Sequence, residues 1–364
     1  MKLEDLFFRP AVSLPLTRPD ASPLDAFLRD VFKKYTSALD DLADSNSISD
    51  EVKTSRQTIR EVAAKLVKAV ASYLQGFPHA GYKHVKSAVT KLADSLDALK
   101  LQVGNGASMR EFERLYRIRQ VERVGYLDNF DREALFHMPF ELRHKVSSNR
   151  YSISGLPCLY LGGSLWVCWE ELQRPEFHSL QVARFRYAEP VNLLDFGFRP
   201  DTIGRLRRSK SRLFDDATVA SYLICWPLVA ACSVRVFYPG ASFKPEYIVP
   251  QLLLQYLRNE TSLDGLRYFS TRIDQHEHSP WAAMNYVFPV QKQAPNGLCP
   301  KLRDKFRLTA PATWSTLEKV APVNVSMELD GWEIRVTEDL GVPYFDTEFF
   351  KCEHKLEGLK CITI

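Results

Sequence analysis

The chain has 364 residues, of which 45% are hydrophobic and 25% charged, a balance typical of a globular protein and not of a disordered chain. Its formal net charge of +4 is spread along the sequence, so neither nucleic acid nor a membrane surface is expected as its main target. Seven cysteines at irregular spacings indicate free thiols in a reducing compartment, and charges and prolines near the start do not predict a signal peptide.

Residues 22–101 show the periodicity of helices. The first segment begins with Ser22 as the expected N-cap and Pro23 at the first helical position. A second segment carries one apolar stripe at three- and four-residue steps, formed by Ile59, Val62, Ala63, Leu66, Val70, Tyr73 and Leu74. A third helix is predicted to run from Lys83 to Val103. These helices predict a small antiparallel bundle without a catalytic constellation, suited to regulation or oligomerisation.

Beyond the glycine-rich stretch 104–109, short strand-like runs alternate with helical stretches. The runs are "RLYRI", "CLYLGG", "SLQVARFRY", "SVRVFYPG" and "GLRYFSTRI". Helices are predicted near 164–173, 215–226 and 250–258, and the apolar stretch around Pro227 is expected in the core. The fold class is therefore α+β, with a mixed α/β region after the helical bundle.

The last part of the chain is predicted to be a short β-rich extension. The stretch from Gln291 to Thr313 has the composition of a loop, and Asp330-Gly331 between two alternating runs predicts a hairpin. We therefore expect three domains, at residues 1–105, 106–292 and 293–364.

The chemistry is expected to centre on "NRYSISGLPCLYLGGSLWVCWEEL", residues 149–172. The pattern predicts a buried strand, a Gly-Gly turn, Ser164 as N-cap and a short helix on which Cys168 and Glu171 share a face. Glu170 points about 100° away from Glu171. A carboxylate on so apolar a helix needs a charged partner or a functional role. Arg117 and Arg150 are the candidate partners, either in a purely structural ion pair or in a functional site.

A third motif, "DGLRYFSTR", alternates so that Leu266, Tyr268 and Ser270 face the same way. Together, "LYRIRQ", "RYSISGLPCLYLGGS" followed by "WEEL", and "DGLRYFSTR" resemble the RES domain family across residues 112–292. That resemblance implies a fold similar to ADP-ribosyltransferases and NAD+ as substrate, with no further cofactor.

When the functional residues of the family are carried over to the matching positions of this sequence, the resemblance implies site residues in two roles. The catalytic group is Arg117, Tyr160, Glu171 and Ser270. The group that contacts NAD+ is Arg150, Tyr116 and Ser152. Glu171 is preferred because family members place the acid eleven residues after the tyrosine, and Glu170 is the alternative. The helical N-terminal part and the C-terminal extension depart from the compact family pattern.

The resemblance implies a bacterial cytoplasmic toxin, of a toxin–antitoxin or anti-phage system, that cleaves the nicotinamide–ribose bond by hydrolysis or phosphorolysis. Implied partners are NAD+, inorganic phosphate, an antitoxin or regulatory protein, and a second copy bound through the N-terminal helices.

Three alternatives stay open. One is protein ADP-ribosylation, and another is a non-enzymatic interaction protein. The third is a HEPN-like ribonuclease using Arg132 and His137 of "REALFH", although a proline soon follows. Cys352, His354 and Cys361 match no zinc spacing, so no metal is predicted.

Overall fold

The structure is a computed structural model in which the chain forms two compact units. It describes residues 1–43, 46–104, 106, 113–121, 131–209, 211, 213–273, 280–318, 333–337 and 340–364. Unit 1 comprises Met1–Leu101, Ser147–Ser154 and Leu194–Ser262, and unit 2 comprises Gln102–Val146, Gly155–Leu193 and Leu263–Ile364. The chain thus passes between the units several times, and the units do not follow the predicted boundaries after residues 105 and 292.

The fold is α+β, as predicted, with a helical N-terminal region and one nine-stranded sheet. Its strand order is β1-β5-β6-β7-β3-β2-β4-β8, and β9 pairs with β4. The chain crosses from one unit to the other within β1 (Lys100–Val103) and β5 (Val191–Phe196). The other seven strands of this sheet, β2, β3, β4, β6, β7, β8 and β9, belong to unit 2.

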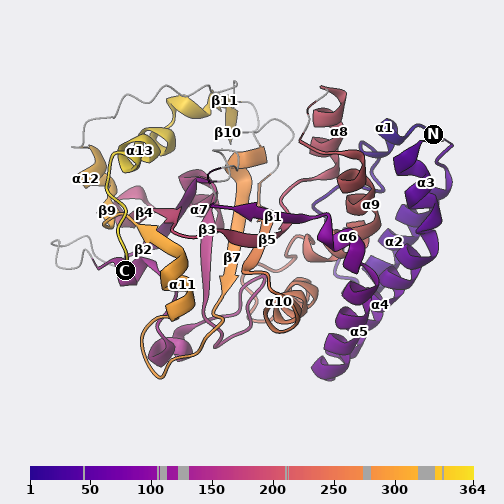
Figure 1. Ribbon diagram of the computed structural model, residues 1–364, viewed down its shortest axis with the longest axis horizontal. Coiled ribbons are helices and arrows are strands. Elements are labelled where there is room, and N and C mark those ends of the chain that lie inside the picture. The colour runs from indigo at the N-terminus through magenta and orange to yellow at the C-terminus, as the bar shows by residue number, and fades with distance from the viewer. Residues whose placement is uncertain are drawn as a thin grey trace. The chain divides into compact units, whose positions relative to one another are not determined.

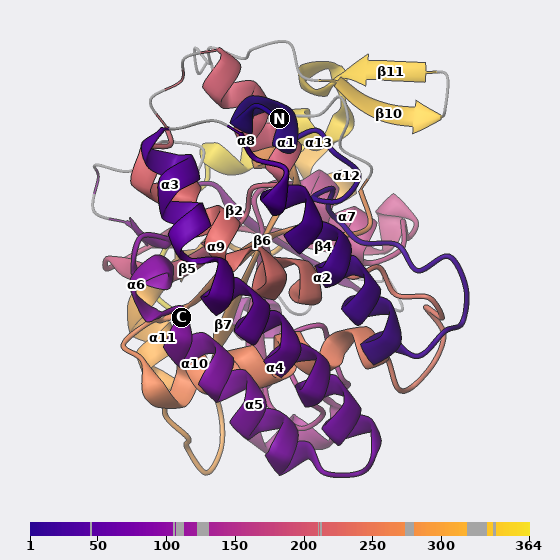
Figure 2. The same cartoon turned by 90° about the vertical axis from the view of Figure 1, so that its right-hand side faces the viewer.

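Unit 1 is helical. Its longer helices are α2 (Leu24–Asp40), α3 (Ser47–Thr54), α4 (Arg56–Leu74), α5 (Pro78–Lys91), α8 (Pro200–Arg208), α9 (Asp216–Cys232) and α10 (Ile248–Glu260). Figure 2 shows α2, α4 and α5 side by side, and α4 also packs on α9. Every residue of α9 from Val219 to Cys232 is buried, and Trp226 stacks on Tyr35 of α2. The bundle therefore includes helices from the second half of the chain.

The helical periodicity is confirmed in α2, α4 and α5, but several ends differ from the prediction. Pro23 itself occupies the N-cap position of α2, so Ser22 lies one residue too early. The third helix ends at Lys91, a short α6 (Ala93–Asp97) follows, and Lys100–Val103 is a strand. In that strand the exposed Lys100 and Gln102 alternate with Leu101 and the buried Val103, a period-two signal that the longer helical pattern concealed.

The apolar stretch around Pro227 lies in the core, as predicted, although its helix continues through the proline to Cys232. The predicted strand "SVRVFYPG" is wrong. Among the described residues, Val234 forms only an isolated bridge with Leu16, so this segment is not part of a strand.

Unit 2 is built on its part of the sheet. The strands are β2 (Leu115–Gln120), β3 (Cys158–Gly162), β4 (Leu180–Tyr187), β6 (Gly265–Phe269), β7 (Met284–Pro289), β8 (Phe306–Leu308) and β9 (Ala312–Thr313). The pairings among these strands are antiparallel. The helices are α7 (Leu165–Glu171), α11 (Pro300–Lys305), α12 (Trp314–Glu318) and α13 (Glu348–Glu357). Figure 1 shows α12 and α13 beside β4 and β9, and they join α7 in one apolar core.

The C-terminal segment is more ordered than its composition predicted. Residues 300–313, expected as loop, form α11, β8 and β9, so that expectation is wrong in this part. Two further strands, β10 (Glu333–Thr337) and β11 (Leu340–Pro343), pair as a hairpin. The turn predicted at Asp330-Gly331 lies outside the described residues, as do most of residues 104–109.

Candidate active site

The short helix α7 begins at the predicted turn. Ser164 is its N-cap, as predicted: its Oγ accepts a hydrogen bond from the Val167 N–H at 3.0 Å and donates one to the Ala282 carbonyl at 2.5 Å. A Cβ added to Gly162 would lie 2.5 Å from Cys168 Sγ, so only glycine lets the helix pack against the end of β3. The glycine turn therefore fixes where α7 starts and where Glu171, at its other end, is placed.

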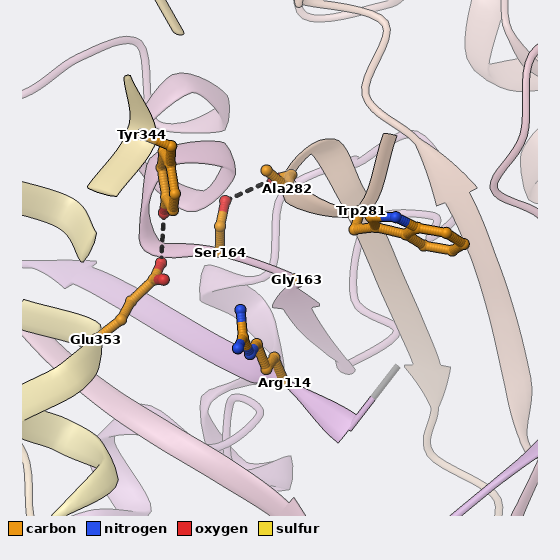
Figure 3. A pocket seen from close by; sticks show the side chains of 7 residues that line it. All are labelled: Arg114, Gly163, Ser164, Trp281, Ala282, Tyr344 and Glu353. Carbon is orange, nitrogen blue, oxygen red and sulfur yellow. Dashed lines mark hydrogen bonds between the residues drawn. The ribbon is translucent and has the colours of Figure 1, made fainter. Parts of the chain in front are cut away.

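A second acidic side chain, Glu353, lies at the start of α7 (Figure 3). Glu353 of α13 accepts hydrogen bonds from the Leu165 N–H and the Tyr344 hydroxyl, each at 2.6 Å. Only 4% of Glu353 is exposed, and burial raises the pKa of its carboxyl to about 7 although both hydrogen bonds and Arg114 lower it. The cavity beside it, about 10 Å³, has room for one water molecule. The C-terminal segment thus holds the helix that carries Glu171.

The Glu171 carboxylate lies in a set of polar contacts within unit 2. Ser270 Oγ donates to Glu171 Oε1 at 2.7 Å and Asn285 Nδ2 donates to the same oxygen at 2.8 Å. Arg272 Nε lies 3.2 Å from Oε2. Ser270 and Asn285 are buried, whereas the Glu171 side chain is 35% exposed. The carboxylate therefore rests on buried donors and keeps an accessible side.

Neighbouring strand ends bring these residues together. In the sheet β7 lies between β6 and β3, and Asn285 of β7 is opposite both Tyr268 and Gly162. Ser270 directly follows β6 and its N–H donates to the Ala283 carbonyl at 2.8 Å. Ser270 and Asn285, which are 99 and 114 positions from Glu171 in the sequence, thus reach its carboxylate from the neighbouring ends of β6 and β7.

Glu170 has a different environment. It is 8% exposed, accepts from Trp166 Nε1 at 3.1 Å and from Arg174 Nε at 2.9 Å, and so closes the end of its own helix. Both of these partners come from residues four positions away. This arrangement favours Glu171 over Glu170 as the carboxylate available to a ligand.

Arg117 lies on β2, and its Nη1 donates to the Tyr160 carbonyl at 3.0 Å. Burial lowers the pKa of Arg117 to about 10, partly offset by Cys168 and Tyr160, so the guanidinium stays charged at neutral pH. Burial also raises the pKa of the Cys168 thiol to about 12, and both Arg117 and Glu171 act on that thiol electrostatically. Arg117, Tyr160 and the Glu171 helix are therefore neighbours within unit 2.

The three residues assigned to NAD+ contact belong to two different units. Tyr116 is fully buried in the apolar core of unit 2. Arg150 and Ser152 belong to unit 1, where Arg150 Nη1 donates to the carbonyls of Cys232 and Val234 at 3.2 and 3.0 Å and Ser152 is 1% exposed. The contacts described around Glu171 come from Ser270, Asn285 and Arg272, and the assignment of Tyr116, Arg150 and Ser152 to NAD+ stays a prediction.

Two residues of the cluster were not predicted from the sequence. Arg272 stands two positions after Ser270, inside the motif "DGLRYFSTR", and its position could have been inferred from the same strand end. Asn285 is an amide within the run "MNYVFP", every residue of which is buried. A polar amide in such a run signals a required hydrogen bond, but it does not reveal the partner.

The ribonuclease alternative is not supported by the position of His137. Arg132 starts a 3₁₀ turn, Arg132–Leu135, and His137 is fully buried after it. His137 Nε2 accepts from the Cys299 N–H at 2.8 Å, so the ring proton sits on Nδ1 and is donated to the Met138 carbonyl. Burial lowers the pKa of His137 to about 4. A neutral, enclosed imidazole of this kind has a structural role.

Replacing His137 by alanine is expected to lower the free energy of unfolding by about 2–4 kcal/mol at pH 7.5, because the Cys299 N–H loses its acceptor and a cavity forms. The loss should shrink as the pH falls from 6.5 towards 4, where the unfolded chain binds a proton that the folded protein excludes. Urea denaturation at pH 7.5 and 5 measures both effects. The exposed His144→Ala is the control, and equal stability of the two variants at pH 7.5 would contradict this role.

Comparisons with known proteins give one relative. No family model matches the chain, and no solved structure matches it significantly. Among the described residues, no helix is long and apolar enough to span a bilayer, and no three metal-binding side chains are grouped to hold an ion. The chain is 29% identical over 347 residues to the protein named "Putative toxin YopC" of Bacillus subtilis (strain 168), covering 93% of this chain and 77% of that protein. This similarity supports a toxin relationship, and the RES resemblance stays a prediction.

Proposed function

We propose that the chain is a toxin that consumes NAD+ by cleaving the bond between nicotinamide and ribose. The observation that carries the proposal is the accessible Glu171 carboxylate, held by Ser270 and Asn285 and adjoined by Arg272. Glu171 and Ser270 are two of the four residues in the catalytic group that the RES resemblance implies. The similarity to a protein named as a toxin supports the biological setting.

The chemistry requires a carboxylate near a developing cation. When the N-glycosidic bond breaks, its electron pair leaves with the nicotinamide nitrogen and positive charge develops on the ribose. A fixed carboxylate stabilises this transition state more than the ground state. Hydrogen bonds from Ser270 and Asn285 orient Glu171, so the charge need not reorganise during the reaction. Water or phosphate then bonds to the anomeric carbon and loses a proton to the solvent.

A guanidinium that matches the pyrophosphate is also available. Arg117 is charged and partly desolvated, and a planar guanidinium can bind a phosphate with two parallel hydrogen bonds. Arg272 offers a second cation, with its side chain 35% exposed. In the proposed roles Glu171 stabilises the ribose cation, Arg117 and Arg272 bind phosphate, and Tyr160 lies beside the nicotinamide ring.

The test is direct incubation of the full chain with NAD+. Nicotinamide should accumulate in proportion to the protein added, measured by liquid chromatography. Mass analysis of the ribose product, with and without phosphate, distinguishes ADP-ribose from its 1-phosphate, and a mass gain on added protein would indicate ADP-ribosyl transfer. Heat-denatured protein is the control. No release of nicotinamide under any of these conditions would refute the proposal.

A further inference from the structure

Unit 1 carries a groove between α2 and α4 whose rim is basic. The groove has a volume of about 430 Å³, and the charged residues that line it are Arg29, Lys33, Arg60 and Lys68, with no carboxylate among its lining residues. All four side chains are exposed. The groove lies wholly within unit 1, whereas the Glu171 cluster lies wholly within unit 2.

The floor of the groove is apolar. Phe32 of α2 and Ala63 and Val67 of α4 form it, each buried beneath the charged rim. Ala64 is exposed beside them, so a small side chain stands where a longer one would fill the space. Lining residues recur along each helix at the three- and four-residue steps that mark one face, over about two turns. Small residues on a helix face let the backbone of another helix approach closely.

The two arginines of the rim are already paired. Arg29 Nη2 lies 3.6 Å from Asp25 Oδ2, and Arg60 Nη2 lies 3.0 Å from Asp40 Oδ2. These exposed pairs contribute little to stability and leave the guanidinium groups open to a second carboxylate.

The two lysines of the rim are not paired. Within the described ranges neither Lys33 nor Lys68 has an ion-pair partner, and they come from the two helices that form the groove. Lys34, next to Lys33, is bound instead to Asp30 at 2.7 Å. The charge of Lys33 and Lys68 therefore lies at the groove, where an acidic ligand would complement it.

We propose that this groove binds an acidic amphipathic helix of a protein partner. The apolar side chains of that helix would rest on Phe32, Ala63 and Val67, and its flanking carboxylates would pair with Lys33 and Lys68. A symmetric dimer through the same face would place two basic rims against each other, because an isologous interface repeats the same patch on both copies. Charge complementarity thus favours a different, acidic protein over a second copy of this chain. The inference does not depend on the proposed function.

The probe is a fluorescein-labelled 16-residue helical peptide with leucine at every third or fourth position and glutamate beside it, titrated with the full chain by fluorescence anisotropy. The acidic peptide should bind, and its Kd should rise at least about tenfold in Lys33→Glu. Lys34→Glu makes the same change of charge one residue away and should leave the Kd within about twofold, since exposed charges outside the interface act weakly.

A second variant separates the groove from general charge attraction. Ala64→Arg adds a positive charge but fills the groove, and it should weaken binding of the acidic peptide. Tighter binding in this variant, or equal loss in Lys33→Glu and Lys34→Glu, would overturn the proposal. Equal binding of a peptide with lysine in place of glutamate would also overturn it. So would a dimer of the unmodified chain, seen by sedimentation, that Lys33→Glu abolishes, because the occupant would then be a second copy.

Discussion

Replacing Glu171 by glutamine is expected to lower the rate of nicotinamide release by about 10²–10³-fold, equivalent to roughly 2.7–4 kcal/mol of transition-state stabilisation. Glutamine keeps a carbonyl oxygen that can accept from Ser270 and Asn285, so the local packing should persist. Only the negative charge beside the ribose is lost. Initial rates of nicotinamide release at saturating NAD+, with thermal unfolding of both proteins, measure the effect and check the fold.

Glu170→Gln is the matched control because it removes the same charge from the adjacent residue. Glu170 is paired with Trp166 of its own helix and with Arg174 just after the helix ends, so this variant should lose some stability and keep turnover within about tenfold. Full activity in Glu171→Gln would end the assignment. If Glu170→Gln alone lost activity, the catalytic carboxylate would be Glu170.

Local signals in the sequence were sufficient to predict much of the helical structure. Apolar residues at helical spacing located α2, α4 and α5, and Ser164 after two glycines located the start of α7. These features depend on residues within a few positions of each other, which is the range over which helix periodicity and capping act.

The assembly of the site depends on contacts that no local pattern encodes. The Ser270 hydrogen bond to Glu171 spans 99 positions and was anticipated only through the RES resemblance. Asn285 and Arg272 complete the same cluster but had no predicted partner. The bundle likewise includes α9 and α10, which come from beyond residue 200. The apolar sequence of α9 predicts that this helix is buried, but it does not show which helices pack against it.

Glu353 is expected to make unit 2 less stable as the pH rises from about 5 to 8. In the unfolded chain its carboxyl releases a proton near the ordinary pKa of 4.5, whereas in the folded protein burial raises the pKa to about 7. Between these values the folded protein holds a proton that the unfolded chain has lost. The stability from this group is therefore complete below about pH 4.5 and is lost as the pH rises through 7, amounting to roughly 3 kcal/mol.

Glu353→Gln tests this directly, because the amide mimics the neutral carboxyl and its oxygen can accept from the Leu165 N–H and the Tyr344 hydroxyl. The variant should match the unmodified protein at pH 5 and exceed its stability by about 2–3 kcal/mol at pH 8. Urea denaturation gives the global value, and hydrogen exchange of the Leu165 amide reports the start of α7 itself. A variant that is less stable at pH 8 would show that the ionised carboxylate is preferred at this site.

The difference in stability between the unmodified protein and Glu353→Gln isolates the effect of Glu353 from that of the other titrating groups. His137 changes stability in the opposite direction, since burial lowers its pKa to about 4, but it is present in both proteins and cancels in the difference. What remains is the cost of an ionised carboxylate at the N-terminus of α7. Because Glu171 ends the same helix, a pH dependence of nicotinamide release that disappears in Glu353→Gln would link this cap to the placement of Glu171. An unchanged pH profile would restrict Glu353 to stability alone.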